Sequence, residues 1–290
     1  MWHQWTVTCS TTGIKLLAFL ASQLKKSYSA KQIKKLIEKN CCQVNGQTER
    51  FASTWLGNAD QVALLIKKLP SEQHLKFDLS AVLYEDKDLL IYNKPAAINC
   101  DESGIVKLLS AYQQNLLLMH RLDRDTTGAL LLVKNQATYN YFLEQFRQLK
   151  VKKKYQAIVD KKVVETKGRI DNQLGKKQTF SGQSIWGAVP KGKRAITHWQ
   201  LVKRGKNASL LHCFPITGRT HQLRVHLAEI GHPILGDHQY CQKFFCTYYP
   251  SHYLLHASSL SFAHPITDEP FTIKAEHSSE FCQAEQELFS

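Results

Sequence analysis

The sequence of 290 residues lacks any apolar run approaching the ~18 residues that a membrane-spanning helix needs. Its N-terminus, Met1-Trp2-His3-Gln4-Trp5, also lacks the basic start and the apolar stretch of a secretion signal. We therefore expect a cytoplasmic protein that does not associate with membranes. The hydrophobic fraction of 43% is typical of a folded chain, and the length suffices for one large domain and one smaller domain.

No Cys-x-x-Cys pair occurs among the eight cysteines. Cys41 and Cys42 are adjacent, while Cys241 and Cys246 have four residues between them. This spacing fits neither a zinc site nor a disulfide framework. In a cytoplasmic protein, cysteines of this kind serve as small buried apolar residues, so we expect no bound metal.

Acidic residues are absent before Glu38, and the formal net charge is +14 with an isoelectric point near 9.4. The lysines that precede Glu38 are Lys15, Lys25, Lys26, Lys31, Lys34 and Lys35. A second basic region extends from Lys150 to Arg194. A single run of charge can be a solvated face, but two basic regions confined to particular segments favour a nucleic-acid partner.

The first 66 residues have the pattern of a small RNA-binding domain. Apolar residues at helical spacing predict a helix over residues 13–24, and Ser29 with Gln32 forms a capping-box pattern before a second, lysine-covered helix. Val44-Asn45-Gly46 then predicts a tight hairpin. This order resembles the RNA-binding domain named after ribosomal protein S-four, from about residue 12 to 65, although Gly13-Ile14-Lys15 departs from the usual start of its first helix.

Residues 67–79 are the predicted linker, and residues 80–290 form the predicted large domain. Two apolar runs flank residues 85–88 and predict a hairpin. A helix is predicted over residues 137–149, with Tyr141, Phe142, Phe146 and Leu149 as its apolar stripe. Hairpins mixed with isolated helices indicate an α+β fold, with a mixed, mainly antiparallel central sheet.

A polar turn, MHRLDRDTTG from Met119 to Gly128, lies between two apolar runs that predict buried strands. Polar clusters in such turns are where a rigid scaffold presents catalytic groups. Asp123 is the candidate catalytic carboxylate. An ion-paired turn without a catalytic role would explain its charged residues equally well.

Two later segments complete the set. Lys152-Lys153-Lys154-Tyr155 opens a predicted strand, and its lysines suit a phosphate backbone, while Tyr155 is either a core residue or a base-stacking one. The stretch TGRTHQLRVHLAEIGHP, from Thr217 to Pro233, predicts a helix that ends at Gly231 and carries Arg224 on the side shared with His221. His221 and His226 are five residues apart, which is not the spacing of zinc ligands on a helix.

In this order, the three segments resemble the signatures of the RluA-type RNA pseudouridine synthases. The likeness extends from about residue 80 to 275 and includes the flanking Asn93-Lys94-Pro95. Thr127 stands where serine is usual, and Ala97 stands where glycine is usual. The resemblance implies an isomerase without a cofactor, which detaches uracil from C1′ of a uridine and rejoins it through C5.

The resemblance also implies the roles of the site residues. Asp123 attacks C1′ or removes a proton from C2′, Arg224 pairs with Asp123, and Tyr155 stacks on the target base. Arg121 fills the gap left by the flipped nucleotide. The RNA-binding residues that we expect are Arg121, Lys31, Lys34, Lys35, Lys152, Lys153, Arg219 and His221.

The expected substrate is structured RNA, most often large-subunit ribosomal RNA in relatives that carry such an N-terminal domain, and the expected state is a monomer. Three alternatives remain at this point. They are a transfer-RNA pseudouridine synthase, an inactive RNA-binding or ribosome-assembly factor, and a histidine-rich metallohydrolase.

Overall fold

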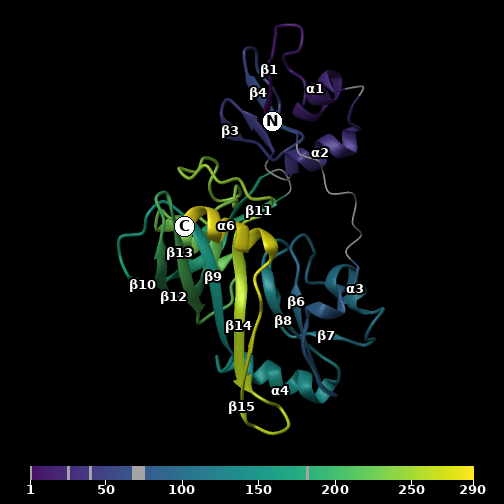
Figure 1. The fold of residues 1–290 in the computed structure, drawn as a ribbon, viewed down its shortest axis with the longest axis vertical. Coiled ribbons are helices and arrows are strands. Elements are labelled where there is room, and N and C mark those ends of the chain that lie inside the picture. Colours follow the sequence, from purple (N-terminus) through teal and green to yellow (C-terminus); the bar gives the residue numbers. More distant parts are fainter. Residues whose placement is uncertain (1, 25–26, 39–40, 67–75, 181–182) are drawn as a thin grey trace.

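The computed structural model describes residues 2–24, 27–38, 41–66, 76–180 and 183–290 (Figure 1). The described residues form two sheets, one of four strands within residues 2–65 and one of 11 strands within residues 82–274. Most of the predicted linker, residues 67–75, lies outside the described residues, as do Lys25, Lys26 and Lys39. The domain boundaries therefore stay a prediction.

The N-terminal sheet carries two helices on one side (Figure 1). Its strand order is β1-β4-β2-β3. The elements are β1 (Trp2–Thr6), α1 (Leu16–Gln23), α2 (Ala30–Glu38), β2 (Cys42–Val44), β3 (Gln47–Thr48) and β4 (Gln61–Leu65).

Local sequence signals account for α2 and for the hairpin after it. The Ser29 N–H donates to Oε1 of Gln32 at 2.8 Å, and the Gln32 N–H donates to Oγ of Ser29 at 3.3 Å, so the predicted capping box is confirmed. Asn45 and Gly46 have φ values of 53° and 75°, as a two-residue hairpin turn requires. The first helix starts at Leu16, later than predicted, because Lys15 before it is extended.

The remaining residues form a larger unit of long strands and few helices. Its strands are β5 (Val82–Glu85), β6 (Leu89–Lys94), β7 (Leu117–Leu118), β8 (Thr127–Val133), β9 (Lys152–Asp160), β10 (Lys167–Phe180), β11 (Gln183–Ala188), β12 (Lys193–Arg204), β13 (Ala208–Pro215), β14 (Leu255–Ala263) and β15 (Pro270–Lys274). Its helices are η1 (Leu79–Ala81), η2 (Glu102–Val106), α3 (Lys107–Leu109), α4 (Gln136–Arg147), α5 (Gln222–Glu229) and α6 (Ser279–Phe289).

The strands of the larger sheet follow the order β11-β10-β12-β13-β9-β14-β8-β6-β5, with β15 beside β14 and β7 beside β8. All described pairs are antiparallel except β14 with β8, so the predicted α+β class with a mainly antiparallel sheet is confirmed. Gly128 is required at this parallel junction, because a Cβ there would lie 2.3 Å from the carbonyl oxygen of Ala257. This pairing of β14 with β8 fixes the first residues of β8, directly after the polar turn.

Both faces of the central strands are buried, which explains their unbroken apolar runs. Leu90 and Leu132 pack in one core, while Leu89 and Leu131 pack in another on the opposite face. The helix α4 covers the second core through Phe142, with Tyr141 and Phe146 beside it. The prediction for Leu149 is wrong: it lies beyond the helix at a φ of 58°, and its side chain is 43% exposed.

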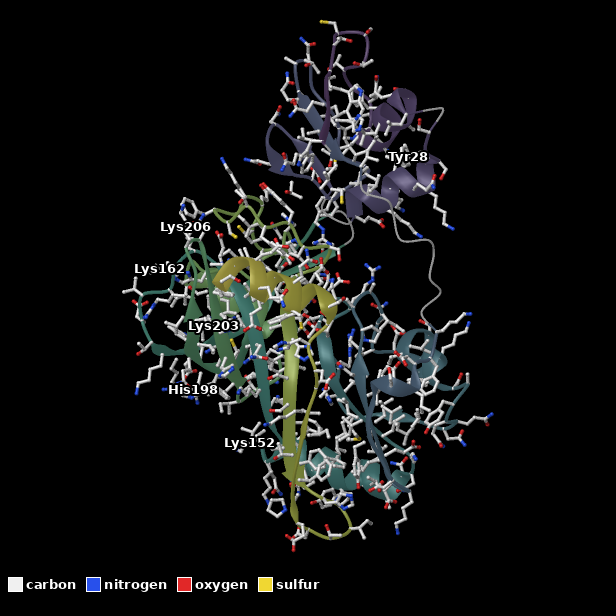
Figure 2. All side chains as sticks on the ribbon, viewed as in Figure 1. Tyr28, Lys152, Lys162, His198, Lys203 and Lys206 are labelled. Atoms are coloured by element: carbon white, nitrogen blue, oxygen red, sulfur yellow. The ribbon has the colours of Figure 1, made fainter. Side chains whose placement is uncertain are left out.

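Exposed lysines are spread over the flank formed by the outer strands. Figure 2 shows Lys162, Lys203 and Lys206 on this flank, and Lys152 lower on the molecule. All four are exposed. No helix in the described part of the chain is both long and apolar enough to cross a membrane.

Candidate active site

Asp123 lies in the turn that joins β7 to β8, as predicted. Leu122 before it is buried and anchors the turn in the core, while the Asp123 side chain is 27% exposed and faces a cavity. The Thr126 N–H donates to the carbonyl oxygen of Asp123 at 3.1 Å, which closes the turn. The loop thus presents one carboxylate on a backbone fixed at both ends.

Lys94, the last residue of β6, also holds the turn that carries Asp123 in place. Its side chain is fully buried, and its Nζ donates to the carbonyl oxygens of Pro95, Ile98 and Arg124 at 2.9, 3.1 and 3.0 Å. Burial lowers the pKa of Lys94 to about 8, although nearby acidic groups oppose that shift. The lysine therefore ties the residue after Asp123 to the turn that follows β6.

Arg224, on α5, approaches Asp123 but is held by a different carboxylate. Its Nη1 lies 3.4 Å from Oδ2 of Asp123, whereas its Nε and Nη2 bind Asp237 at 2.7 and 2.8 Å. Its Nη2 also donates to Oε1 of Gln239 at 2.7 Å. The expected pairing with Asp123 is present, but the bidentate partner is Asp237, a fully buried residue.

Two tyrosine rings enclose the Arg224 guanidinium. Its carbon lies 4.5 Å from the ring centre of Tyr253 and 5.1 Å from that of Tyr240. Burial alone would lower the pKa of Arg224, but the charges of Asp237 and Asp123 raise it well above its ordinary value. The arginine is a permanent, rigid cation beside the Asp123 carboxylate.

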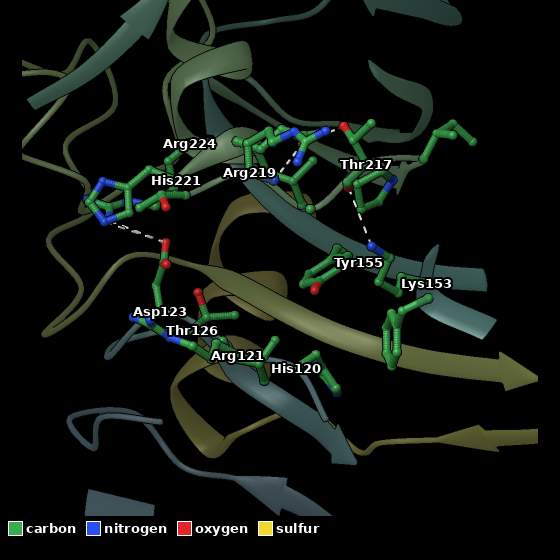
Figure 3. Close-up of a pocket in the computed structure, with 18 of the residues that line it drawn as sticks. His120, Arg121, Asp123, Thr126, Lys153, Tyr155, Thr217, Arg219, His221 and Arg224 are labelled. Atoms are coloured by element: carbon green, nitrogen blue, oxygen red, sulfur yellow. Dashed lines mark hydrogen bonds and ion pairs between the residues drawn. The ribbon is translucent and has the colours of Figure 1, made fainter. Parts of the chain in front are cut away.

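Tyr155 lies near the start of β9, between two hydrophobic cores, and lines the cavity that Asp123 faces. Burial of the ring, with a contribution from the charge of Asp123, raises the pKa of Tyr155. The phenol is thus protonated at neutral pH. Figure 3 shows the Tyr155 side chain directed into the space between Asp123 and Lys153.

The cavity has a volume of about 710 Å³, within the range of pockets that hold small molecules. Besides Asp123, Tyr155 and Arg224, it is lined by four residues of the predicted RNA-binding set. They are Arg121, Lys153, Arg219 and His221 (Figure 3). The structure therefore brings the three predicted segments together around one cavity.

The basic residues of the cavity differ in exposure. Arg121 and Arg219 are exposed, whereas burial lowers the pKa of Lys153 to about 8 and its Nζ donates to the Thr217 carbonyl oxygen at 3.4 Å. His120, in the same turn as Asp123, accepts the Leu131 N–H at 3.0 Å through Nε2. Burial lowers the pKa of His120 to about 3, so it orders the loop as a neutral ring.

The other predicted RNA-binding residues lie outside the cavity. Lys152 is exposed at the start of β9 and donates to the Leu149 carbonyl oxygen at 3.1 Å. Lys31, Lys34 and Lys35 lie on α2 of the N-terminal sheet unit, where Lys34 is 3.8 Å from Glu38. No group of three or more histidine, cysteine, aspartate or glutamate side chains in the described ranges could hold a metal ion.

Sequence reasoning missed two residues that shape the site. Asp237 lies four residues beyond the third stretch, where a charged residue directly after Ile234-Leu235-Gly236 was the available signal. Arg50, between β3 and β4, had no signal at all. Burial lowers its pKa, which the charges of Asp237 and Asp125 oppose, and its buried Nε has no hydrogen-bond partner among the described residues. The N-terminal unit thus places a cation near the Arg224–Asp237 pair.

Comparisons with known proteins identify the family of this chain. The sequence profile of the family described as RNA pseudouridylate synthase matches residues 88–229. Ribosomal large subunit pseudouridine synthase C of Buchnera aphidicola is 38% identical over an alignment of 197 positions, which covers 63% of this chain and 62% of that protein. The chain therefore spans less than two thirds of the length of that relative.

Two further proteins share more of their length with this chain. Ribosomal large subunit pseudouridine synthase D of Haemophilus ducreyi is 30% identical over an alignment of 300 positions, gaps included, which covers 93% of this chain and 90% of that protein. The solved structure titled Human RNA Pseudouridylate Synthase Domain Containing 4 has a TM-score of 0.60 and 25% identity, covering 71% of this chain and 92% of that chain. This chain belongs to the family of RNA pseudouridine synthases, in its RluA-type branch.

Proposed function

We propose that this protein isomerises uridine to pseudouridine in large-subunit ribosomal RNA. The observation that carries the proposal is the convergence of Asp123, Tyr155 and Arg224 on one cavity, from segments far apart in the sequence. The names of the Buchnera and Haemophilus relatives support ribosomal RNA as the substrate.

Asp123 starts the reaction as the ionised carboxylate that faces the cavity. Attack on C1′ and removal of a proton from C2′ both break the bond between C1′ and N1 of uracil. The base then turns and forms the bond between C1′ and C5. In the first route this displaces Asp123 from C1′, and in the second the proton returns to C2′. The C5 proton then leaves, and N1 takes up a proton. No water is consumed, so one carboxylate suffices where a glycoside hydrolase needs two.

The target nucleotide must leave the RNA stack to reach Asp123, at a cost of about a few kcal/mol. A cavity of about 710 Å³ accommodates a nucleotide, and the protonated ring of Tyr155 offers a face for the uracil to stack on. We expect Arg121, which is exposed and lines the cavity near Asp123, to occupy the gap in the stack. Lys153 and Arg219 supply positive charge for the flanking phosphates.

The N-terminal unit is the proposed RNA anchor, as a domain of the ribosomal-protein-S-four type. Its exposed Lys31 and Lys34 lie on α2, with Lys35 on the same helix. Deleting residues 1–66 should weaken RNA binding and flatten its dependence on salt, because each lost phosphate contact removes a released counterion.

Tritium release tests the isomerisation directly. Transcripts of large-subunit ribosomal RNA labelled with tritium at C5 of uridine should lose label to water when the wild-type protein is added. RNA binding without any release would show an inactive binding protein and would overturn the proposal.

Mapping of pseudouridine in cells that lack the protein tests the substrate. We expect one or more pseudouridines to disappear from large-subunit ribosomal RNA and to return when the wild-type chain is supplied. Loss confined to transfer RNA would contradict the ribosomal assignment while leaving the isomerase intact.

A further inference from the structure

His221 occupies the residue before α5 and has an unusual backbone conformation. Its φ of 54° and ψ of 20° are left-handed, a region that is uncommon for residues other than glycine, although asparagine, aspartate and histidine adopt it more often than the rest. The side chain lines the cavity and is 19% exposed. Strained residues of this kind cluster at functional sites, which points to a role for the His221 ring in this one.

One ring nitrogen of His221 is held by Tyr240. The distance between Nδ1 and the Tyr240 hydroxyl oxygen is 2.6 Å. The same hydroxyl oxygen accepts the backbone N–H of Trp186, on β11, at 3.3 Å. Because this oxygen already accepts the Trp186 N–H, donation of the hydroxyl proton to Nδ1 is the arrangement in which the Tyr240 hydroxyl both accepts and donates.

The other ring nitrogen faces Asp123. Nε2 of His221 lies 4.0 Å from Oδ2 of Asp123, the same oxygen that Nη1 of Arg224 approaches at 3.4 Å. Figure 3 shows these two contacts converging on one end of the carboxylate. An Nε2 that carries the proton is attracted to this oxygen, whereas an Nε2 lone pair would be repelled by it.

We propose that His221 is a positioning residue, whose Nε2–H, set by Tyr240, holds Oδ2 of Asp123 together with Arg224 and leaves Oδ1 to face the uridine. The distance of 4.0 Å is about 1 Å longer than a hydrogen bond, and catalytic hydrogen bonds commonly tighten when substrate binds. This role is additional to the RNA contact that the sequence predicts for His221, which stays a prediction.

The charge state of the ring supports this role. Burial, with a contribution from Arg224, lowers the pKa of His221 to about 4, although Asp123 opposes the shift. At neutral pH the ring is therefore neutral, with one N–H to direct. A neutral ring adds a donor to the Asp123 carboxylate without competing with Arg224 as a second cation.

Two substitutions separate this role from a merely structural one. The side-chain nitrogen of glutamine in His221→Gln takes the place of Nε2 and can still donate to Asp123. In His221→Asn the nitrogen takes the place of Nδ1 and cannot reach it. Asparagine, however, adopts a left-handed backbone more readily than glutamine, so a purely structural role would favour the asparagine variant.

The proposal rests on the proposed function, and steady-state tritium release from C5-labelled large-subunit transcripts tests it. We expect His221→Asn to lower kcat by about 10- to 100-fold, the effect of losing one hydrogen bond to a charged group, with KM for the RNA little changed. His221→Gln should recover most of kcat, and Tyr240→Phe, which keeps the ring over Arg224, should lower it.

Melting temperatures measured on the same samples identify any loss that comes from unfolding. A kcat for His221→Asn equal to or above that of His221→Gln would overturn the proposal, as would an effect on KM alone. A wild-type protein that releases no tritium would instead overturn the proposed function, so the two failures are distinguishable.

Discussion

Arg224 and Asp237 form a bidentate ion pair, with 2.7 Å between Nε and Oδ2 and 2.8 Å between Nη2 and Oδ1. Their side chains are 5% and 0% exposed. Asp237 thus fixes the plane of the Arg224 guanidinium. Nε and Nη2 are bound to Asp237, so Nη1 is the nitrogen that can interact with Asp123. The proposed catalytic carboxylate, Asp123, is thus approached by an arginine that a second carboxylate holds in place.

Asp237→Asn should therefore impair both stability and activity. Removal of one partner leaves a buried charge without its main counterion, which lowers the free energy of unfolding by about 3 kcal/mol and lets Nη1 move away from Asp123. Denaturant unfolding and tritium release measure the two effects. Asp171→Asn is the matched control, because Asp171 pairs with Arg194 at the surface, at 2.7 Å, and should matter little. Equal effects of the two substitutions would contradict this reading of the ion pair.

Lys94→Met should loosen the turn that carries Asp123. Methionine fills a similar volume but leaves the carbonyl oxygens of Pro95, Ile98 and Arg124 without their donor, at a cost of about 1 to 3 kcal/mol for a buried group left unsatisfied. We expect lower kcat together with lower stability, measured by tritium release and thermal melting. A variant as active and stable as the wild type would show that the lysine does not hold the loop.

Ala97→Gly should stabilise the protein. Ala97 has a φ of 67° in the turn that Lys94 closes, where the family resemblance places a glycine. Relief of about 1 to 2 kcal/mol of left-handed strain outweighs the greater chain entropy of glycine, for a net gain of about 0.5 to 1 kcal/mol. The reverse change, Gly231→Ala, is the control, since Gly231 has a φ of 84° with no atom within 4 Å of the added Cβ. It should destabilise by about 1 kcal/mol in the same denaturant titration.

Stability should fall in mild acid because of buried histidines such as His256. Its Nδ1 lies 2.8 Å from the Thr127 hydroxyl, and burial lowers its pKa to about 4. In the unfolded chain the pKa is about 6.5, so the unfolded state binds more protons between these values and is favoured as pH falls. This one group should remove about 2 kcal/mol between pH 7 and pH 5.

Denaturant unfolding of His256→Gln at both pH values checks this expectation. The variant should lose less stability than the wild type on going from pH 7 to pH 5. His198→Gln, at an exposed position on β12, should behave as the wild type does. An unchanged pH dependence in His256→Gln would mean that another group controls the acid response.

Local signals in the sequence predict those parts of the fold that local chemistry determines. The capping box at Ser29 and the left-handed pair Asn45-Gly46 need only neighbours along the chain, and both are confirmed. The apolar stripe predicts an end of α4 at Leu149, but the helix ends at Arg147, and the left-handed turn at Leu149 has no glycine or proline to mark it.

The sequence predicts the three segments that form the site, but it does not predict the ion pairs and hydrogen bonds between their side chains. Apolar flanks and polar turns predict that Asp123, Tyr155 and Arg224 are presented by a scaffold, and the family resemblance predicts that they meet. The choice of Asp237 over Asp123 as the bidentate partner depends on how α5 packs against the loop after it. The burial of Arg50 depends on how two sheets meet, and no pattern along the chain encodes that contact.

The central claim is that Asp123 is the catalytic carboxylate, and Asp123→Asn tests it most directly. Asparagine keeps the shape of the side chain but removes the charge that the reaction needs. Tritium release from C5-labelled large-subunit transcripts should fall to the level of RNA without protein, while binding of the same RNA persists. Turnover near the wild-type rate in this variant would contradict the account.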